Sequence, residues 1–294
     1  MLNTKTSKLS LTIDGADKTE VVLLLHGGPG VPDYLAEVAG ILSDRFKTVR
    51  FDQRGVGNSL SKNEEYEIYQ YLSDIDSILE HLQVDKIHIF GHSWGGLLAQ
   101  LWAADNHNKV KSLFLCSPSS GTGKVWETME KEVMHYNQKK CTSMEWMSMG
   151  LNSLLGLIGL NYGYRNVFKQ VWKNYFLVPN AAPDASVNWL SGINATAVNK
   201  TRKSIVATDN NKLDRDINGL NVPVIVTFGQ YDIYGESKNL VQKRLPNSLQ
   251  TIFENAGHLP WIQDEELFTL AVNEFYSAST IMANEQLGAR NKGI

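Results

Sequence analysis

Cysteine is nearly absent from this sequence. Among 294 residues there are only two, Cys116 and Cys141. Neither stands at the spacing from other cysteines or histidines that a metal site requires, and two thiols are too few for a framework of disulfides. We therefore expect neither a structural zinc site nor a fold that depends on disulfide bonds.

Long apolar runs and a strong net charge are also missing. The longest apolar stretch, Leu151 to Leu160, is interrupted by Asn, Ser and two Gly, and it is too short to span a bilayer. The net charge of -3 gives no reason to expect nucleic acid or an anionic membrane as a partner. Residues 1–6 are polar and lack the apolar core of a signal peptide. We expect a cytoplasmic protein that is a monomer or a small homo-oligomer, with no nucleic acid and no membrane as partner.

The sequence does contain a series of short apolar runs of the kind that form strands buried on both faces. Between two of them, Tyr66 to Leu82 carries apolar residues at helical spacing. This alternation predicts an α/β fold with a mostly parallel central sheet and helices on both faces. The predicted strands are Val21–Leu25, Thr48–Phe51, Lys86–Phe90, Val110–Leu115, Val222–Phe228 and Leu249–Phe253.

The pattern changes between Ser119 and about Asp216. This stretch has no apolar run of the buried-strand type, and it holds four of the seven tryptophans. We interpret residues 121–216 as a helical cap, or lid, inserted into a core formed by residues 1–120 and 217–294. One apolar face of the cap is predicted to be its underside, turned toward the core and the substrate. The residues concerned are Met144, Trp146, Met147, Met149 and the run Leu151–Leu160.

A serine stands at the junction between one predicted strand and the next helix. The segment Gly91-His92-Ser93-Trp94-Gly95 follows Lys86–Phe90 and precedes a helical run. A strand, a sharp turn with a central serine and a helix form the context of a nucleophile elbow. Glycines on either side let the strand and the helix approach each other. The sequence therefore predicts Ser93 as a nucleophile.

A serine hydroxyl is a weak nucleophile and needs a base that is oriented by an acid. Asp232 and His258 each follow a late strand, in the chain order Ser, Asp, His that this type of site uses. The carboxyl ends of parallel strands meet at one edge of a sheet. We predict that His258 accepts the proton of Ser93 and that Asp232 orients the imidazole. The rivals for the acid are Asp264 and Glu265, whereas His26 and His92 are predicted not to be the base.

An acyl transfer also needs donors for the developing oxyanion. One predicted donor is the backbone N–H of Trp94, directly after the serine. The other comes from His26-Gly27-Gly28-Pro29-Gly30, which follows the first apolar run. Gly28 is the preferred donor in this loop and Gly27 is the alternative.

Three segments together resemble the α/β-hydrolase superfamily and, more narrowly, its prolyl aminopeptidase (proline iminopeptidase) branch. They are His26-Gly27-Gly28-Pro29-Gly30, Asp52-Gln53-Arg54-Gly55-Val56-Gly57-Asn58-Ser59 and Gly91-His92-Ser93-Trp94-Gly95-Gly96. The resemblance covers residues 8–120 and 217–276. It implies the α/β-hydrolase fold, a serine peptidase or esterase activity on a small molecule or a short peptide, and no cofactor.

The sequence departs from the branch where the substrate amine would bind. Members hold the free α-amine with acidic residues, often in a Trp-x-x-Trp-Glu type segment of the cap, and Glu145-Trp146 is only a partial counterpart. Some members carry an acidic residue directly after the triad aspartate, where this chain has Ile233. Glu236 is the nearest substitute. The candidate substrate residues are accordingly Gly27, Glu145, Trp146 and Glu236.

Three functions stay open at this point. The first is cleavage of small peptides or amides, as in the prolyl aminopeptidase branch, which requires a cap carboxylate within reach of the amine. The acidic residues of the cap are Glu127, Glu130, Glu132, Glu145 and Asp184, among others. The second is a small-molecule esterase or lactonase, favoured by the missing Trp-x-x-Trp-Glu segment. The third is a ligand receptor of low turnover, which an intact set of Ser93, Asp232 and His258 disfavours.

Overall fold

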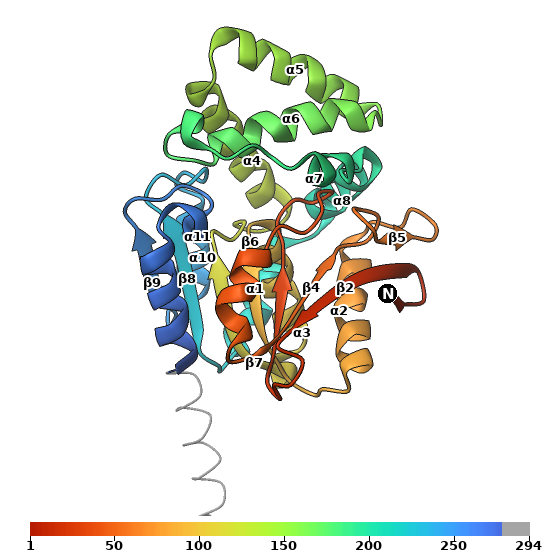
Figure 1. Ribbon diagram of the computed structural model, residues 1–294, viewed down its shortest axis with the longest axis vertical. Coiled ribbons are helices and arrows are strands. Elements are labelled where there is room, and N and C mark those ends of the chain that lie inside the picture. The colour runs from red at the N-terminus through yellow and green to blue at the C-terminus, as the bar shows by residue number, and fades with distance from the viewer. Residues whose placement is uncertain (278–294) are drawn as a thin grey trace, which may run out of the picture.

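The computed structural model describes residues 1–277, whose centre is a nine-stranded sheet. Eight strands follow the order β1-β2-β4-β3-β6-β7-β8-β9, and β5 pairs with β2. Neighbours from β4 to β9 are parallel, so the predicted mostly parallel sheet is confirmed (Figure 1). The strands are β1 Leu2–Asn3, β2 Ser7–Asp14, β3 Val21–Leu25, β4 Lys47–Asp52, β5 Leu60–Ser61, β6 Ile87–His92, β7 Val110–Cys116, β8 Val224–Gly229 and β9 Leu249–Phe253.

The sequence analysis missed β1 and β5, which have two residues each, and the longer strand β2. Strand β2 pairs antiparallel with β4, and its burial falls toward its end, so it has no continuous apolar run. Its signal is only the alternation of Leu9, Leu11 and Ile13 with polar residues. The predicted strand over Val222–Phe228 starts later, at Val224, directly after a proline, which has no N–H to donate.

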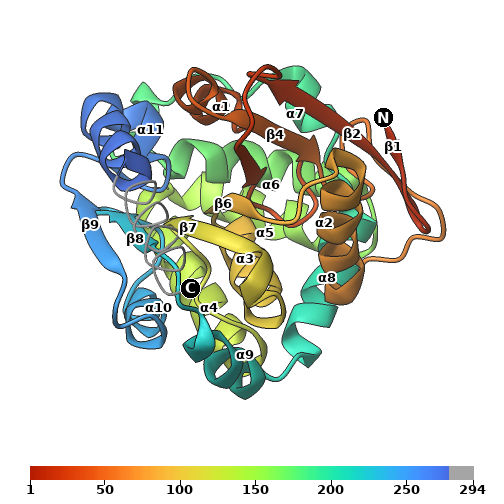
Figure 2. The same ribbon diagram turned by 90° about the horizontal axis from the view of Figure 1, so that it is seen from below.

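Helices cover both faces of the sheet, as predicted. In Figure 2, α1 lies on one side, and α2 and α3 lie on the other. These are α1 Ala36–Ser43, α2 Ile68–Leu82 and α3 Trp94–Asp105. The carboxyl-terminal part contributes α10 Lys238–Arg244, α11 Pro260–Gln263 and a further helix that begins at residue 265. The predicted core segment 217–294 is therefore described as far as residue 277.

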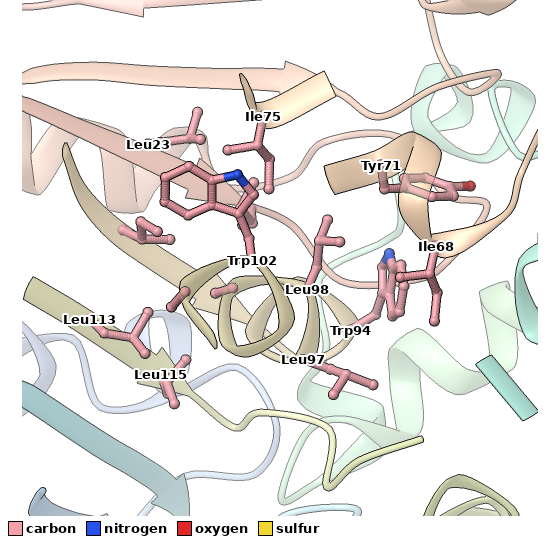
Figure 3. Packing of buried hydrophobic residues seen from close by; sticks show 14 of the residues in the cluster. Leu23, Ile68, Tyr71, Ile75, Trp94, Leu97, Leu98, Trp102, Leu113 and Leu115 are labelled. Atoms are coloured by element: carbon pink, nitrogen blue, oxygen red, sulfur yellow. The ribbon is translucent and has the colours of Figure 1, made fainter. Parts of the chain in front are cut away.

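Helix α3 is held at the centre of the larger of the two main hydrophobic clusters. Its Trp94 and Trp102 are fully buried, and Tyr71 of α2 meets Trp94 edge to face at 5.7 Å between ring centroids. Figure 3 shows these side chains between α3, α2 and the strands. Burying two tryptophans fixes the position of α3, and with it the position of the serine that precedes it.

Only helices and turns lie between β7 and β8. They lie beyond the carboxyl ends of the strands, with α5 and α6 farthest from the sheet (Figure 1). The division of the chain into a core and a cap stays a prediction, and "cap" is used below for these helices. They are α4 Gly123–Lys140, α5 Ser143–Leu157, α6 Asn161–Asn174, α7 Val187–Ser191, α8 Ala195–Ala207 and α9 Asn210–Asp216, with short 3-10 turns at Pro179–Ala181 and Ile217–Gly219.

The predicted apolar underside of the cap is wrong for most of its residues. Met149 is buried, but Met144 and Met147 are 78% and 64% exposed. The same holds for Leu151, Leu154, Leu157, Ile158 and Leu160, all of them half exposed or more. The reason is that α5 packs mainly on α6, so that most of its apolar residues lie on parts of the helix that no other element covers.

Candidate active site

Ser93 stands between the end of β6 and the start of α3, where the sequence predicts it. Its backbone is at φ 56° and ψ -121°, a region that L-residues rarely occupy. Such a conformation costs about 1–3 kcal/mol and persists only where the surroundings impose it. Its N–H donates to Cys116 O at 3.1 Å, and its carbonyl accepts from Ser119 N at 2.9 Å. The loop after β7 thus holds the serine in this conformation.

Three glycines leave room for the turn around the serine. A Cβ on Gly95 would lie 2.0 Å from the carbonyl oxygen of Leu25, and one on Gly91 would lie 2.7 Å from Gly95 O. On Gly96 it would meet Pro118 at 2.7 Å. Because the nearest atoms at Gly91 and Gly95 are backbone, they cannot move aside as a flexible side chain could.

Asp232 and His258 form a fully buried pair at the same edge of the sheet. Asp232 follows β8, His258 follows β9, and Asp232 Oδ1 lies 2.9 Å from His258 Nδ1. Since a carboxylate only accepts, Nδ1 carries the proton and Nε2 of the neutral ring is left as an acceptor. The second oxygen, Oδ2, accepts a hydrogen bond from Ser117 Oγ at 2.5 Å. The predicted rivals, Asp264 and Glu265, make no hydrogen bond to His258 in the described residues.

The hydroxyl of Ser93 is turned toward a tyrosine. Ser93 Oγ lies 3.1 Å from Tyr234 Oη, which is also 2.8 Å from Ser119 Oγ. The ring of Tyr234 packs edge-on against His258 at 5.3 Å. Within residues 1–277, His258 Nε2 is buried without a hydrogen-bond partner. The structure thus gathers Ser93, Asp232 and His258 around Tyr234, but no hydrogen bond joins the serine to the histidine.

His92 neighbours the serine but is engaged elsewhere, as predicted. Gly27 N–H donates to Tyr34 Oη at 2.9 Å, and Tyr34 Oη lies 2.6 Å from His92 Nδ1. His92 Nε2 then donates to the carbonyl of His258 at 2.9 Å. Burial holds the pKa of His92 well below its usual value, so the ring is neutral and serves to position the His258 backbone.

The same chain of hydrogen bonds decides between Gly27 and Gly28, the two candidate oxyanion donors in the glycine loop. The Gly27 N–H is occupied by Tyr34, whereas Gly28 lines a cavity together with Ser93. Trp94 is the first residue of α3, where N–H groups have no partner within the helix. Gly28 and Trp94 are therefore the donors that we retain.

The Asp52-to-Ser59 motif links the elements around the site through buried hydrogen bonds. Gln53 donates to His26 O at 2.8 Å and accepts from Trp94 Nε1 at 2.9 Å, which ties the glycine loop to α3. Arg54 makes a bidentate pair with Asp74 of α2 at 2.9 and 2.7 Å. All of these side chains are buried, and the motif is structural in this chain.

A cavity of about 710 Å³ opens between Ser93 and the cap. Its floor includes Gly28, Ser93, Ser119 and Tyr234. Its walls are mainly apolar residues of the cap helices: Trp126, Met129, Val133, Met134, Trp146, Met149, Leu157, Val167, Phe168 and Val171. The charged residues of its lining are Glu127, Glu130, Lys131 and Arg202, whose signs balance.

One cap carboxylate of this cavity is already paired. Arg202 Nε and Nη2 donate to the two oxygens of Glu130, both at 2.6 Å. A carboxylate held in such a bidentate pair has little capacity left for a substrate ammonium. Glu127, one turn before Glu130 on α4, also lines the cavity.

The candidate substrate residues fall into two groups. Trp146 lines the cavity, and a Cβ on Gly27 would lie 2.9 Å from Ser93 Cβ. Glu145 does not line it, because its carboxylate caps the start of α5 through Thr142. Glu236 is exposed and accepts a hydrogen bond from Asn239 of α10. We do not carry Glu145 and Glu236 forward as substrate residues.

Three residues at the site escaped the sequence analysis, and a fourth, Glu132, was named only among the acidic residues of the cap. Ser117 and Ser119 follow β7, and Tyr234 stands two residues after Asp232. Glu132 of α4 accepts hydrogen bonds from Gly235 N and from Ser237, which ties the acid loop to the cap. The one available signal for the first three was that they stand close to predicted strand ends. Nothing in the sequence links Glu132 to a loop 100 residues away.

The described residues contain no cluster of three or more His, Cys, Asp or Glu that could hold a metal ion. In the same part of the chain, no helix combines the length and the apolar character that crossing a bilayer requires.

Comparison with known proteins agrees with this architecture. The family model described as the alpha/beta hydrolase fold matches residues 20–265. The proline iminopeptidase of Clostridioides difficile (strain 630) is 24% identical over 271 residues, covering 88% of this chain and 90% of that protein. Among solved structures, a thermophilic esterase from Thermogutta terrifontis superposes with a TM-score of 0.65 at 20% identity, over 93% of this chain and 94% of its own. An enol-lactonase from Burkholderia xenovorans LB400 gives 0.64 at 20% identity, over 92% and 97%.

Proposed function

This chain belongs to the alpha/beta hydrolase family and is a hydrolase, and we propose that it works as a serine hydrolase through Ser93, His258 and Asp232. The observation that carries the proposal is the buried Asp232–His258 pair beside a serine in a strained elbow. The pair leaves Nε2 as a free acceptor, buried beside the ring of Tyr234, which lines the cavity.

The proposed reaction begins with a rotation of the Ser93 hydroxyl from Tyr234 toward His258. Nε2 accepts the proton while Oγ attacks the substrate carbonyl, and the N–H groups of Gly28 and Trp94 stabilise the oxyanion. The protonated imidazole then passes its proton to the leaving amine or alcohol, which leaves an acyl-enzyme. A water molecule, activated by the same histidine, hydrolyses the acyl-enzyme and restores Ser93.

We propose the amide bond of a small peptide with a free amino terminus as the first substrate class. The named relative is a proline iminopeptidase, and two carboxylates, Glu127 and Glu130, line the cavity. An ester or lactone of an apolar acid is the second class. It is favoured by the apolar walls and by the pairing of Glu130 with Arg202, which removes a charge that an ammonium would need.

The test compares proline β-naphthylamide, its N-acetylated form and p-nitrophenyl butyrate, with Ser93→Ala as the blank. Faster cleavage of the free amine than of the acetylated form supports the peptide class. Serine-dependent cleavage of the ester alone assigns the second class. Cleavage of none of the three would support the reading as a receptor of low turnover.

The variant Arg202→Gln sharpens this test, because it frees Glu130. If the cavity binds an ammonium, we expect a several-fold lower KM for the free prolyl amide, with no change for the acetylated form. The matched control is Glu130→Gln, which breaks the same pair but leaves no new carboxylate. Equal effects of both variants on both substrates would contradict a role for Glu130 in amine binding.

A further inference from the structure

The face of α5 that points away from the cavity carries a stripe of large apolar side chains. Met144, Met147, Leu151, Leu154 and Ile158 follow one another at steps of three and four residues, and they are 78%, 64%, 61%, 61% and 74% exposed. Steps of this kind place the residues on one side of a helix. We call these five residues the outer α5 face.

The apolar surface continues past the end of the helix. Leu160 in the turn after α5 and Tyr162 in the first turn of α6 are also half exposed or more. Figure 1 shows α5 as the outermost element at the end of the molecule opposite the strands' amino ends, with α6 beneath it. A contiguous exposed apolar patch of this extent on a folded protein marks a surface that meets another apolar phase or partner.

Positive charge accompanies this patch. Residues 139–177 contain five basic residues and one acidic residue, whereas the chain as a whole has a net charge of -3. Two of the cations, Lys169 and Lys173 on α6, line a shallow groove together with Met144 and Tyr162, and the one acidic residue, Glu145, lines it too. The cations therefore flank the apolar surface, so that one partner can meet both.

We propose that the outer α5 face docks on an anionic lipid surface, with α5 lying in the plane of the interface. An amphipathic helix with exposed Leu, Ile and Met, beside basic residues, is the pattern that binds such surfaces. Lysines near an anionic leaflet each add about 1 kcal/mol. Self-association through the same face is disfavoured, because it would bring two patches of the same positive sign together. The sequence analysis expected no membrane partner from the net charge of -3, and this value averages over the uneven distribution of charge along the chain.

The position of the face gives docking a consequence for substrates. The inner side of α5 contributes Trp146, Met149 and Ser153 to the cavity that holds Ser93. The helix thus separates the cavity from the proposed lipid surface by its own thickness. Resting on the second substrate class of the proposed function, the esters and lactones, this arrangement points to acyl substrates that partition into lipid, because docking would place the roof of the cavity against the phase that holds them.

Vesicle flotation tests the docking without any use of hydrolysis. The full chain carrying Ser93→Ala is mixed with vesicles of phosphatidylcholine alone, or with a third of the lipid as phosphatidylglycerol. We expect flotation with the anionic vesicles and at least tenfold less with the neutral ones. Adding Met147→Glu, Leu151→Glu and Leu154→Glu should abolish binding. Lys169→Gln with Lys173→Gln should weaken it about tenfold or more, from the loss of two charges.

The matched control replaces Leu60 and Leu249 by Glu, since both are nearly as exposed as the leucines of the outer α5 face but lie on β5 and β9. It should float as the parent does. In the chain with Ser93 intact, the outer-face variant should cleave a soluble ester at an unchanged rate, which shows that it is folded. Failure of the parent to float, equal flotation with neutral vesicles, or a dimer in sedimentation velocity that the outer-face variant dissociates would each overturn the proposal. None of these results depends on whether Ser93 is the nucleophile.

Discussion

The serine elbow and helix α5 lie on opposite sides of one cavity and are built in opposite ways. Residues 91–96 are all buried, and at Gly91 and Gly95 backbone atoms occupy the space that a side chain would need. Helix α5 has a buried Met149 on one side and the outer α5 face on the other, and a Cβ on its Gly150 would meet nothing within 4 Å. The conformation of the elbow is fixed by packing against the rest of this chain, whereas α5 is packed on one side only. Substitutions should therefore be costly in the first region and mild in the second.

The largest expected difference concerns two serines that both line the cavity. Ser93→Ala should lower kcat by about 10⁴-fold or more, because it removes the proposed nucleophile. Ser153→Ala makes the same chemical change on α5, and we expect less than a threefold effect. Steady-state rates on the best of the three substrates above measure both. Activity of Ser93→Ala within tenfold of the parent would contradict the proposed mechanism.

The elbow should also respond strongly in stability. Gly95→Ala places a Cβ 2.0 Å from the carbonyl oxygen of Leu25, so the strand and the helix must separate. We expect a loss of at least about 3 kcal/mol in the free energy of unfolding, or no folded protein, since strain of this kind belongs to the severe class. Urea unfolding followed by tryptophan fluorescence measures it. A change below about 0.5 kcal/mol would show that the turn is looser than its contacts imply.

A smaller effect is expected from Tyr234, which contacts both Ser93 and Ser119. Burial raises the pKa of Tyr234, so it stays a hydroxyl that can donate to Ser93 or to the reacting carbonyl. Losing one such bond is worth about 1–1.5 kcal/mol, and Tyr234→Phe should therefore lower kcat about tenfold with a smaller change in KM. Tyr162→Phe, at the exposed turn after α5, is the control and should leave the rate on a soluble substrate unchanged. A pure KM effect of Tyr234→Phe would mean that the tyrosine only binds substrate.

The contrast between the two regions also explains what the sequence could predict. The elbow, the positions of Asp232 and His258 at strand ends and the parallel sheet could be predicted, because each leaves a short pattern in the sequence: a glycine-flanked serine, an acid or a base just after an apolar run, and apolar runs that alternate with helices. The hydroxyls of Ser117 and Tyr234 could not be assigned, since their hydrogen bonds join loops that are more than 100 residues apart.

The orientation of α5 was predicted wrongly for a related reason. An apolar stripe at helical spacing shows that a helix has an apolar face, but not what that face meets. For Met147 and Leu151 the sequence analysis assumed the core of the same chain, and both are exposed. Strand β2 was missed because its alternating pattern is weak beside the continuous runs of β3 and β6.

The smallest expected effect is a gain in stability, and it tests α5, the less tightly packed of the two regions. Gly150 lies within α5, in an ordinary helical conformation with open space around a Cβ. Alanine there should stabilise the protein by about 0.5–1 kcal/mol, because glycine loses more backbone entropy than alanine in a helix. Urea unfolding beside the Gly95→Ala variant gives the two values on one scale. If Gly150→Ala is destabilising instead, α5 is packed more tightly than its contacts show. Its outer face would then be covered by other residues of this chain rather than by a partner.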